Sequence, residues 1–249
     1  MGAEHVKTVV INGDTDGIDN PVRAALLGPH SHLALSHGNA LRYPADVSPF
    51  AALPDSPSED DWRDAAELFG PGRVLGLATV GSSLTLPAGW EVLLDLPGVQ
   101  LVAEDVIGKA AEEAVRLGPE DVPEMLALVG RTKPGPFLSR TIEMGAYFGI
   151  RHDGDLVAMA GQRLHPPGWT EISAVCTRED HRGRGLATTL VLALVAEIKS
   201  RGETPFLHAA ASNTTAIRLY ESLGFRVRRQ VTFIGVRVPG DPATSEPRE

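Results

Sequence analysis

The segment between Cys176 and Val195 (CTREDHRGRGLATTLVLALV) places two glycines and several arginines directly before a long apolar stretch. Gly183 and Gly185 carry no side chain and allow unusual backbone angles, so an anionic group can approach the main chain there. The first-turn amides of a following helix carry partial positive charge, to which Arg182 and Arg184 add. This arrangement predicts a site for a phosphate-bearing ligand. A flexible turn with solvated arginines is the alternative interpretation of this stretch alone.

Two common phosphate-binding motifs do not fit the segment. The P-loop pattern G-x-x-x-x-G-K-[ST] is absent, and the fingerprint G-x-G-x-x-G is broken because its third glycine position is Thr188. Glu203 stands about twenty residues further on, where that fingerprint has an acid, but it precedes the next predicted strand and is badly placed to meet a ribose. The ligand is therefore expected to be held in another way.

The elements around this segment are predicted by periodicity and turn residues. A strand over residues 169–177 precedes the helix predicted over 183–200, whose apolar residues recur every four positions and must pack on a sheet. From residue 119 onward we expect the order α, α, β, β, β, α, β, α, β, with Asp153-Gly154 forming a type I′ turn between two strands. Strands alternate with helices only late in this order, so a mixed sheet with parallel pairing near its middle is expected.

The first part of the chain has no motif to which chemistry can be attached. The pattern predicts a strand over residues 6–12, helices near 21–27, 30–37 and 60–70, three strands between 72 and 105, and a helical stretch over 111–118. We therefore divide the chain into an N-terminal α/β region, a linker, a main domain and a disordered tail, at residues 1–105, 106–118, 119–238 and 239–249.

Three matches resemble the GNAT N-acetyltransferase superfamily. The run from Arg182 to Ala187 (RGRGLA) is similar to its R/Q-x-x-G-x-G/A signature, EISAVCT stands where that family has a splayed strand, and SNTTAIRLYESLGF resembles its N-x-x-A-x-x-x-Y-E-x-x-G-F segment. The resemblance covers residues 116–238. It implies an α/β fold with a mixed sheet, the GNAT-like acyl-CoA N-acyltransferase fold, preceded by a smaller N-terminal α/β region. That region is either a degenerate copy of the same fold or a separate cap.

The ligand that the resemblance implies is acetyl-coenzyme A, used as a co-substrate. Its pyrophosphate would be held by backbone amides, and its pantetheine arm would pair with the strand that ends at Thr177. This requires that strand to diverge from the strand near residues 206–210, often through a bulge. The implied binding residues are Val175, Cys176, Thr177, Arg182, Gly183, Arg184, Gly185, Leu186, Ala187, Thr188, Asn213 and Tyr220.

The resemblance also suggests catalytic roles. Glu171 matches the position of a base-bearing glutamate in the histone-modifying members of the family, provided that burial raises its pKa; a water-mediated path and a solvated strand-end residue are the alternatives. Tyr220 matches a tyrosine that protonates the leaving thiolate, or else it is an aromatic residue packed on the core. A backbone amide near Thr177 could stabilise the developing oxyanion. Asn213 could cap a helix and touch the co-substrate as well.

Composition and charge exclude several classes. A net charge of −9 argues against a nucleic-acid binder and is weakly compatible with a cationic substrate. The chain shows neither a signal-peptide pattern nor a long apolar run, so we expect a cytoplasmic protein without a membrane span. Cys176 is the single cysteine, and His30, His32 and His37 lack a completing ligand, so no metal is expected.

We therefore expect an enzyme that transfers an acetyl group from acetyl-CoA to a primary amine by direct attack in a ternary complex. A non-catalytic acyl-CoA sensor and a phosphometabolite-binding protein are the alternatives. The identity of the amine and the choice between monomer and homodimer stay open. The acceptor pocket is expected from residues 132–149, the final strands and the first region.

Overall fold

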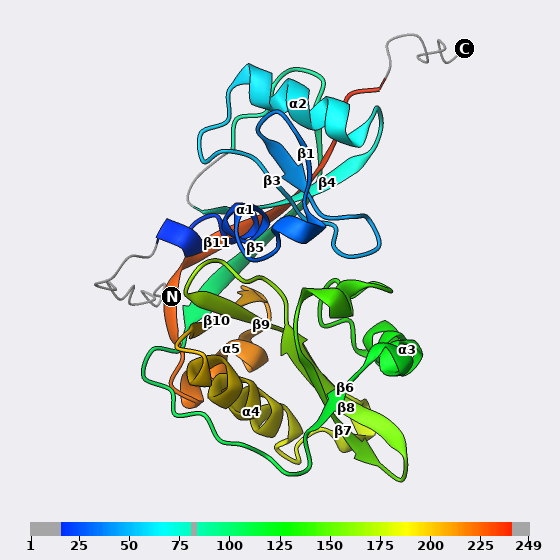
Figure 1. The fold of residues 1–249 in the computed structure, drawn as a ribbon, viewed down its shortest axis with the longest axis vertical. Coiled ribbons are helices and arrows are strands. Elements are labelled where there is room, and N and C mark those ends of the chain that lie inside the picture. Colours follow the sequence, from blue (N-terminus) through cyan, green and yellow to red (C-terminus); the bar gives the residue numbers. More distant parts are fainter. Residues whose placement is uncertain (1–15, 81–83, 241–249) are drawn as a thin grey trace, which may run out of the picture.

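A computed structural model describes residues 16–80 and 84–240, and its centre is one mixed eight-stranded sheet (Figure 1). The strand order is β4-β11-β5-β10-β9-β8-β7-β6, and β9 with β10 is the parallel pair. The strands are β4 (Val74–Val80), β5 (Glu91–Val102), β6 (Val115–Leu117), β7 (Tyr147–His152), β8 (Asp155–Gln162), β9 (Trp169–Thr177), β10 (Thr204–Ala210) and β11 (Arg226–Arg237).

Helices cover both faces of this sheet, and a small sheet lies beyond its β4 end. The helices are α1 (Pro21–Leu27), α2 (Glu59–Phe69), α3 (Val122–Thr132), α4 (Leu186–Ser200) and α5 (Thr214–Ser222), with 3-10 turns η1 (Asp16–Ile18), η2 (Ser31–Leu33), η3 (Pro119–Asp121), η4 (Thr141–Met144) and η5 (Glu179–His181). The small antiparallel sheet comprises β1 (Leu35–His37), β2 (Ala40–Arg42) and β3 (Ala51–Ala52). None of the described helices is long and apolar enough to cross a membrane.

The repeating apolar pattern of α4 becomes the centre of the main core. Leu190, Leu194 and Ile198 are fully buried and pack in one cluster with residues of β8, β9 and β10. Met125 and Leu128 of α3 belong to a second cluster with other residues of β7, β8 and β9. Successive strand residues point to opposite faces, so these two clusters lie on the two sides of the same strands. The expected mixed α/β fold is confirmed.

The first half of the chain contributes the strands β4 and β5 to the main sheet. This differs from the expected division, which placed a boundary at residue 105. β5 lies between β10 and β11 and pairs antiparallel with both, while β4 extends the sheet beyond β11 (Figure 1). Val99 and Leu101 of β5 are buried in the same cluster as α4. Local composition misplaced the boundary because the strand that completes the sheet is remote in sequence from its neighbours.

Several local predictions can be compared with the structure. Asp153 and Gly154 have φ of 52° and 90°, as a type I′ turn requires. The helix expected near 30–37 is a 3-10 turn followed by β1, and the three strands expected between 72 and 105 are two. The stretch 111–118, expected to be helical, contains β6 because pairing with β7 overrides its helical composition. The strand predicted over residues 6–12 and most of the tail predicted to be disordered lie outside the described residues.

Candidate active site

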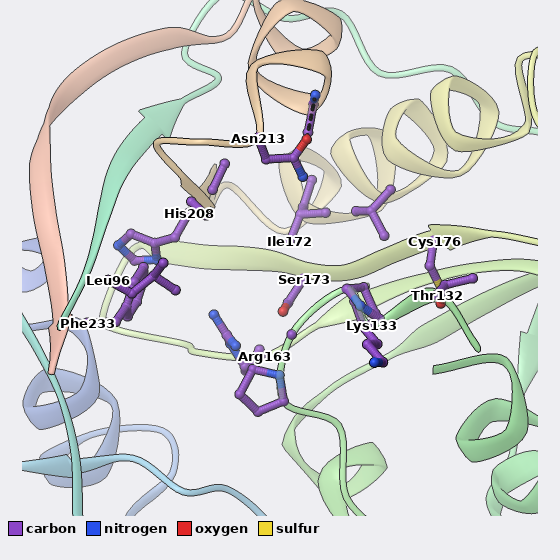
Figure 2. Close-up of a pocket in the computed structure, with 18 of the residues that line it drawn as sticks. Leu96, Thr132, Lys133, Arg163, Ile172, Ser173, Cys176, His208, Asn213 and Phe233 are labelled. Atoms are coloured by element: carbon purple, nitrogen blue, oxygen red, sulfur yellow. Dashed lines mark hydrogen bonds between the residues drawn. The ribbon is translucent and has the colours of Figure 1, made fainter. Parts of the chain in front are cut away.

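A cavity of about 1100 Å³ opens where β9 and β10 separate (Figure 2). β9, the turn before α4, and α5 form one side of it. The loop after α3, β4, β5 and β11 form the rest. The acceptor pocket was expected from residues 132–149, the final strands and the first region; Thr132–Pro136, Phe233 and Leu94 line the cavity, so each of those three segments contributes.

The separation of β9 from β10 follows from a bulge in β9. The parallel pairing ends at Ile172 and Leu207, after which β10 continues along β5 and β9 along β8. Between Ser173 and Cys176 the register of β9 against β8 shifts by one residue, and Ala174 there has a φ of 52°. A non-glycine residue in this region is strained, and such strain is concentrated at functional sites. The expected bulged, diverging strand is therefore present.

The glycine turn before α4 is open in the way that an approaching anion requires. Gly183 and Gly185 have φ of 75° and 79°, and a Cβ added at either would meet no atom within 4 Å. Gly185 is the N-cap of α4 and supplies no side chain to satisfy the first-turn amides. Arg182 Nε lies 3.4 Å from the Thr177 carbonyl oxygen, and Arg184 Nη2 donates to the Asp180 carbonyl oxygen at 3.2 Å. The turn therefore presents backbone donors and positive charge beside an empty volume.

Two buried polar atoms on the same wall support the presence of a ligand. Thr177 Oγ1 and His181 Nε2 have no hydrogen-bond partner among the described residues, and both side chains belong to residues that line the cavity. Buried polar atoms are nearly always paired, so each is expected to find a partner in a bound molecule or water. The wall formed by β9 and the glycine turn thus offers polar atoms to a bound molecule.

α5 contributes the next two predicted residues. Asn213 Oδ1 accepts a hydrogen bond from the Ala216 amide at 3.2 Å, which confirms the N-cap and leaves the Asn213 amide nitrogen toward the cavity (Figure 2). Tyr220 lines the cavity and packs on Phe225, so it occupies both of the places that the sequence suggested. Burial, and secondarily the Cys176 thiol, raise the pKa of Tyr220 to about 12, which keeps its hydroxyl protonated at neutral pH.

Glu171 does not satisfy the condition that a general base requires. Its side chain is fully buried, which by itself raises its pKa, but Arg163 binds both carboxylate oxygens at 2.7 and 2.8 Å. The charge and hydrogen bonds of Arg163, together with the hydrogen bond from His208, outweigh burial and lower the pKa of Glu171 to about 2. Sequence reasoning made burial a condition for the base role and kept a solvated residue as the alternative. It missed Arg163, because that partner lies on the segment after β8.

Glu171 belongs to a buried hydrogen-bond chain across four strands. Gln100 Oε1 accepts from Arg228 at 2.9 Å, so Gln100 Nε2 is the donor toward Ile18 O at 2.8 Å and His208 Nε2 at 3.2 Å. His208 therefore carries its proton on Nδ1 and donates it to Glu171 Oε1 at 2.7 Å. Both ring nitrogens of His208 are thus engaged in this chain.

Two other residues noted in the sequence, Cys176 and His30, make contacts that indicate a structural role. Cys176 is buried among apolar residues, and burial raises the pKa of its thiol, in keeping with a small hydrophobic residue. His30 contacts the Tyr43 hydroxyl at 2.9 Å and the Met144 carbonyl at 3.0 Å, so both ring nitrogens are engaged. Within residues 16–80 and 84–240, no group of three or more His, Cys, Asp or Glu side chains is placed to hold a metal ion.

Comparison with known proteins shows which protein family the chain resembles. The family model described as FR47-like protein matches residues 147–234. The chain is 40% identical to a putative GNAT-family acetyltransferase from Novosphingobium aromaticivorans, with a TM-score of 0.81 over 88% of this chain and 97% of that one. A GCN5-related N-acetyltransferase from Kribbella flavida, 20% identical, shares the fold with a TM-score of 0.59 over 90% of this chain and 97% of that one.

Two curated relatives extend the comparison. L-methionine sulfoximine/L-methionine sulfone acetyltransferase of Pseudomonas aeruginosa is 30% identical over 144 residues, which is 57% of this chain and 80% of that protein. Mycothiol acetyltransferase of Thermobispora bispora is 45% identical over 56 residues, which is 22% of this chain and 19% of that protein. The chain belongs to the GNAT family and is an acetyltransferase.

Proposed function

We propose that the protein transfers an acetyl group from acetyl-CoA to a primary amine by direct attack within a ternary complex. The observation that carries this proposal is the gap between β9 and β10, which runs into the open glycine turn of α4 and has Tyr220 on its wall. Acetyl-CoA supplies an activated thioester, and this chain supplies the groups that bind and orient it. The relatives' names mention different acceptors, and what they share is acetyl transfer.

Backbone groups do most of the donor binding in this proposal. The amides from Arg182 to Thr188 hold the pyrophosphate in this proposal, because the helix start has no side-chain cap and the added Cβ positions at the glycines are free. The Arg182 amide donates to the Glu179 carbonyl oxygen at 3.2 Å, so the amides after it are the main donors. Val175, Cys176 and Thr177 offer main-chain groups along the part of β9 that β10 leaves. Asn213 adds a side-chain amide from α5. A site built in this way tolerates side-chain changes more readily than changes at its glycines.

Two groups stabilise charge during transfer. A backbone amide beside the β9 bulge donates to the thioester oxygen as it becomes negative, a contribution of roughly 10²–10³ in rate when the donor is well placed. Tyr220 donates a hydrogen bond to the departing sulfur. The pKa of Tyr220 is about 12, whereas a thiol has an ordinary pKa near 8.5, so complete proton transfer from Tyr220 to the thiolate is uphill. The hydroxyl therefore acts as a hydrogen-bond donor, and solvent supplies the final proton.

The surroundings of Glu171 and His208 favour a water-mediated path for proton removal from the amine. Glu171 is held by Arg163 with a pKa of about 2, and both nitrogens of His208 are engaged. We therefore replace the expected glutamate base by water. The amine binds as the free base and attacks the thioester carbonyl carbon. It gives up one of its two N–H protons to solvent as the C–S bond breaks. The rate should then rise with pH as the acceptor amine deprotonates, because the protonated amine has no lone pair to attack with.

The test of the proposed function combines turnover and binding. An amine library is incubated with acetyl-CoA and read by mass spectrometry, and acetyl-CoA binding is measured by calorimetry. Tyr220→Phe is expected to lower kcat by roughly 10²-fold with acetyl-CoA affinity within a few-fold of the parent, because one charge-stabilising donor is removed. Tyr147→Phe is the matched control, since its buried hydroxyl also lacks a partner among the described residues but does not line the cavity.

The donor-binding half is tested at the glycine turn. Gly185→Ala is expected to abolish measurable acetyl-CoA binding, since its methyl group enters the volume assigned to the pyrophosphate. Gly202→Ala is the matched control, because Gly202 has a φ of 77° and an equally free Cβ position but follows the other end of α4. Equal loss of acetyl-CoA affinity in the two variants, or full affinity in Gly185→Ala, would contradict the proposed donor site.

A further inference from the structure

The wall of the cavity opposite β9 is apolar and open. Leu94 and Leu96 of β5 and Phe233 of β11 face the cavity, with Phe50 beside them. Leu94 and Leu96 are 51% and 37% exposed, because this half of β5 pairs with β11 alone, whereas β10 lies beside β5 only from Gly98 onward. An apolar molecule seated against this wall would remove them from water. A small ligand with a hydrophobic body is therefore favoured there.

The charge inside the cavity is opposite in sign to the charge of the chain. The ionisable side chains that line it in the described residues include Lys133, Arg163 and Arg182, and none of its described lining residues is Asp or Glu. Glu171 lies behind Arg163, fully buried with both oxygens engaged. A polycationic acceptor would therefore enter a cavity that offers no carboxylate from the described chain. The net charge of −9 for the whole chain therefore does not indicate the sign of the charge inside the cavity.

Two of these cations line the cavity with donor groups that make no hydrogen bond to the described chain. Lys133 Nζ makes no hydrogen bond or ion pair with the described residues, and its backbone adopts a φ of 50° at the end of α3. Arg163 uses Nε and Nη2 for Glu171, which leaves Nη1 without a hydrogen bond to the described chain, and its guanidinium lies 5.0 Å from the Phe50 ring centre. Figure 2 shows Arg163, Ser173 and Lys133 on the side of β9 away from Asn213.

We infer that the acceptor is a small α-amino acid with an apolar side chain, whose carboxylate binds Lys133 and the free Nη1 of Arg163 and whose side chain lies against Leu94, Leu96 and Phe233. The inference rests on the proposed function, because it names the acceptor of the same transfer. An α-amino acid matches all three observations: it brings an anion for the cations, an apolar group for the wall, and a single positive charge that is lost on becoming the nucleophile.

The experiment measures kcat/KM with acetyl-CoA for L-leucine, L-leucinamide and spermidine, with products identified by mass spectrometry. Leucinamide keeps the side chain and the amine but lacks the carboxylate, and its amine is less basic, so it would be the better acceptor if the carboxylate were not recognised. Leucine is expected to exceed leucinamide and spermidine by at least roughly tenfold, since a hydrogen bond to a charged group typically contributes that factor.

The variant Lys133→Met tests whether Lys133 causes the preference for leucine over leucinamide. It is expected to reduce kcat/KM for leucine by roughly tenfold, mainly through KM, and to leave leucinamide within about twofold. Lys109→Met is the matched control, because Lys109 is exposed and does not line the cavity, and it should change neither substrate. Preference for leucinamide or spermidine in the parent, or equal losses for both substrates in Lys133→Met, overturns the amino-acid inference and leaves acetyl transfer standing. Absence of turnover with every amine while acetyl-CoA binds overturns the proposed function, and this inference with it.

Discussion

At the scale of single residues, Glu171 shows how a partner reverses the effect of burial. The sequence marks a glutamate in a strand next to the expected active site, and burial alone would raise its pKa toward that of a useful base. Arg163 and His208 come from other segments and keep the carboxylate ionised. Neither residue stands out in the sequence, although an arginine directly after the apolar strand β8 is the kind of signal that could have indicated a buried partner.

Substitution of Glu171 tests this assignment. Glu171→Gln should lower the free energy of unfolding by about 3–5 kcal/mol, because it leaves the Arg163 charge buried without its partner. Chemical denaturation followed by tryptophan fluorescence measures this loss. The double variant Arg163→Met/Glu171→Leu should recover most of the loss, since an apolar pair of similar volume removes both charges. A different result would restore Glu171 as the base: a Glu171→Gln variant as stable as the parent, whose acetyl-transfer rate no longer depends on pH.

At the scale of elements, β5 joins the first half of the chain to the second half within one sheet. Leu101 is fully buried between β10 and β11, in one cluster with Leu194 of α4. We expect Leu101→Ala to lower the free energy of unfolding of the whole chain by about 2–5 kcal/mol, with a single transition in fluorescence and circular dichroism. Val92→Ala on the exposed half of β5 should cost far less. Separate transitions, with only one of them shifted by Leu101→Ala, would restore a boundary near residue 105.

The elements also show what sequence reasoning can reach. Those of the second half were predicted in order, except that the second expected helix is the 3-10 turn η4. Their signals are local: apolar repeats in α4, Asp-Gly between β7 and β8, and Gly224 after α5. The bulge and separation of β9 were expected from the family resemblance, and the structure contains both. The insertion of β5 and the short strand β6 could not be predicted in this way, since each depends on a partner far along the chain. The same reason explains why Lys133 and Arg163 were not singled out.

At the scale of the whole molecule, buried histidines make stability depend on pH. His30 is 4% exposed, and burial, followed by the nearby His165, lowers its pKa to about 4 from 6.5. The unfolded chain therefore binds a proton that the folded chain does not, so this contribution is complete above about pH 6.5 and is lost as the pH falls toward 4. Glu171 contributes in a lower window, between its ordinary pKa and about 2.

We expect the free energy of unfolding to fall by roughly 3 kcal/mol between pH 7 and pH 4 through His30 alone. Denaturant titrations at a series of pH values measure this slope. His30→Gln should flatten the slope, whereas His37→Gln, at an exposed histidine, should leave it unchanged. A parent protein whose stability is constant from pH 7 to pH 4 would show that His30 does not remain neutral and buried.

The position of β5 also has a consequence for how the chain is made. Ribosomal synthesis completes residues 91–102 long before β10 and β11, the two strands that flank them. Until residues 204–210 have emerged, β5 has neither neighbour, and its N-terminal half waits longer, for β11. Its apolar residues Leu93, Leu94 and Leu96 are available for unwanted association during that time. Pairings over such sequence distances also slow the search for the native topology. A nascent chain of this acetyltransferase is thus an expected client of chaperones that shield strands awaiting late-arriving partners.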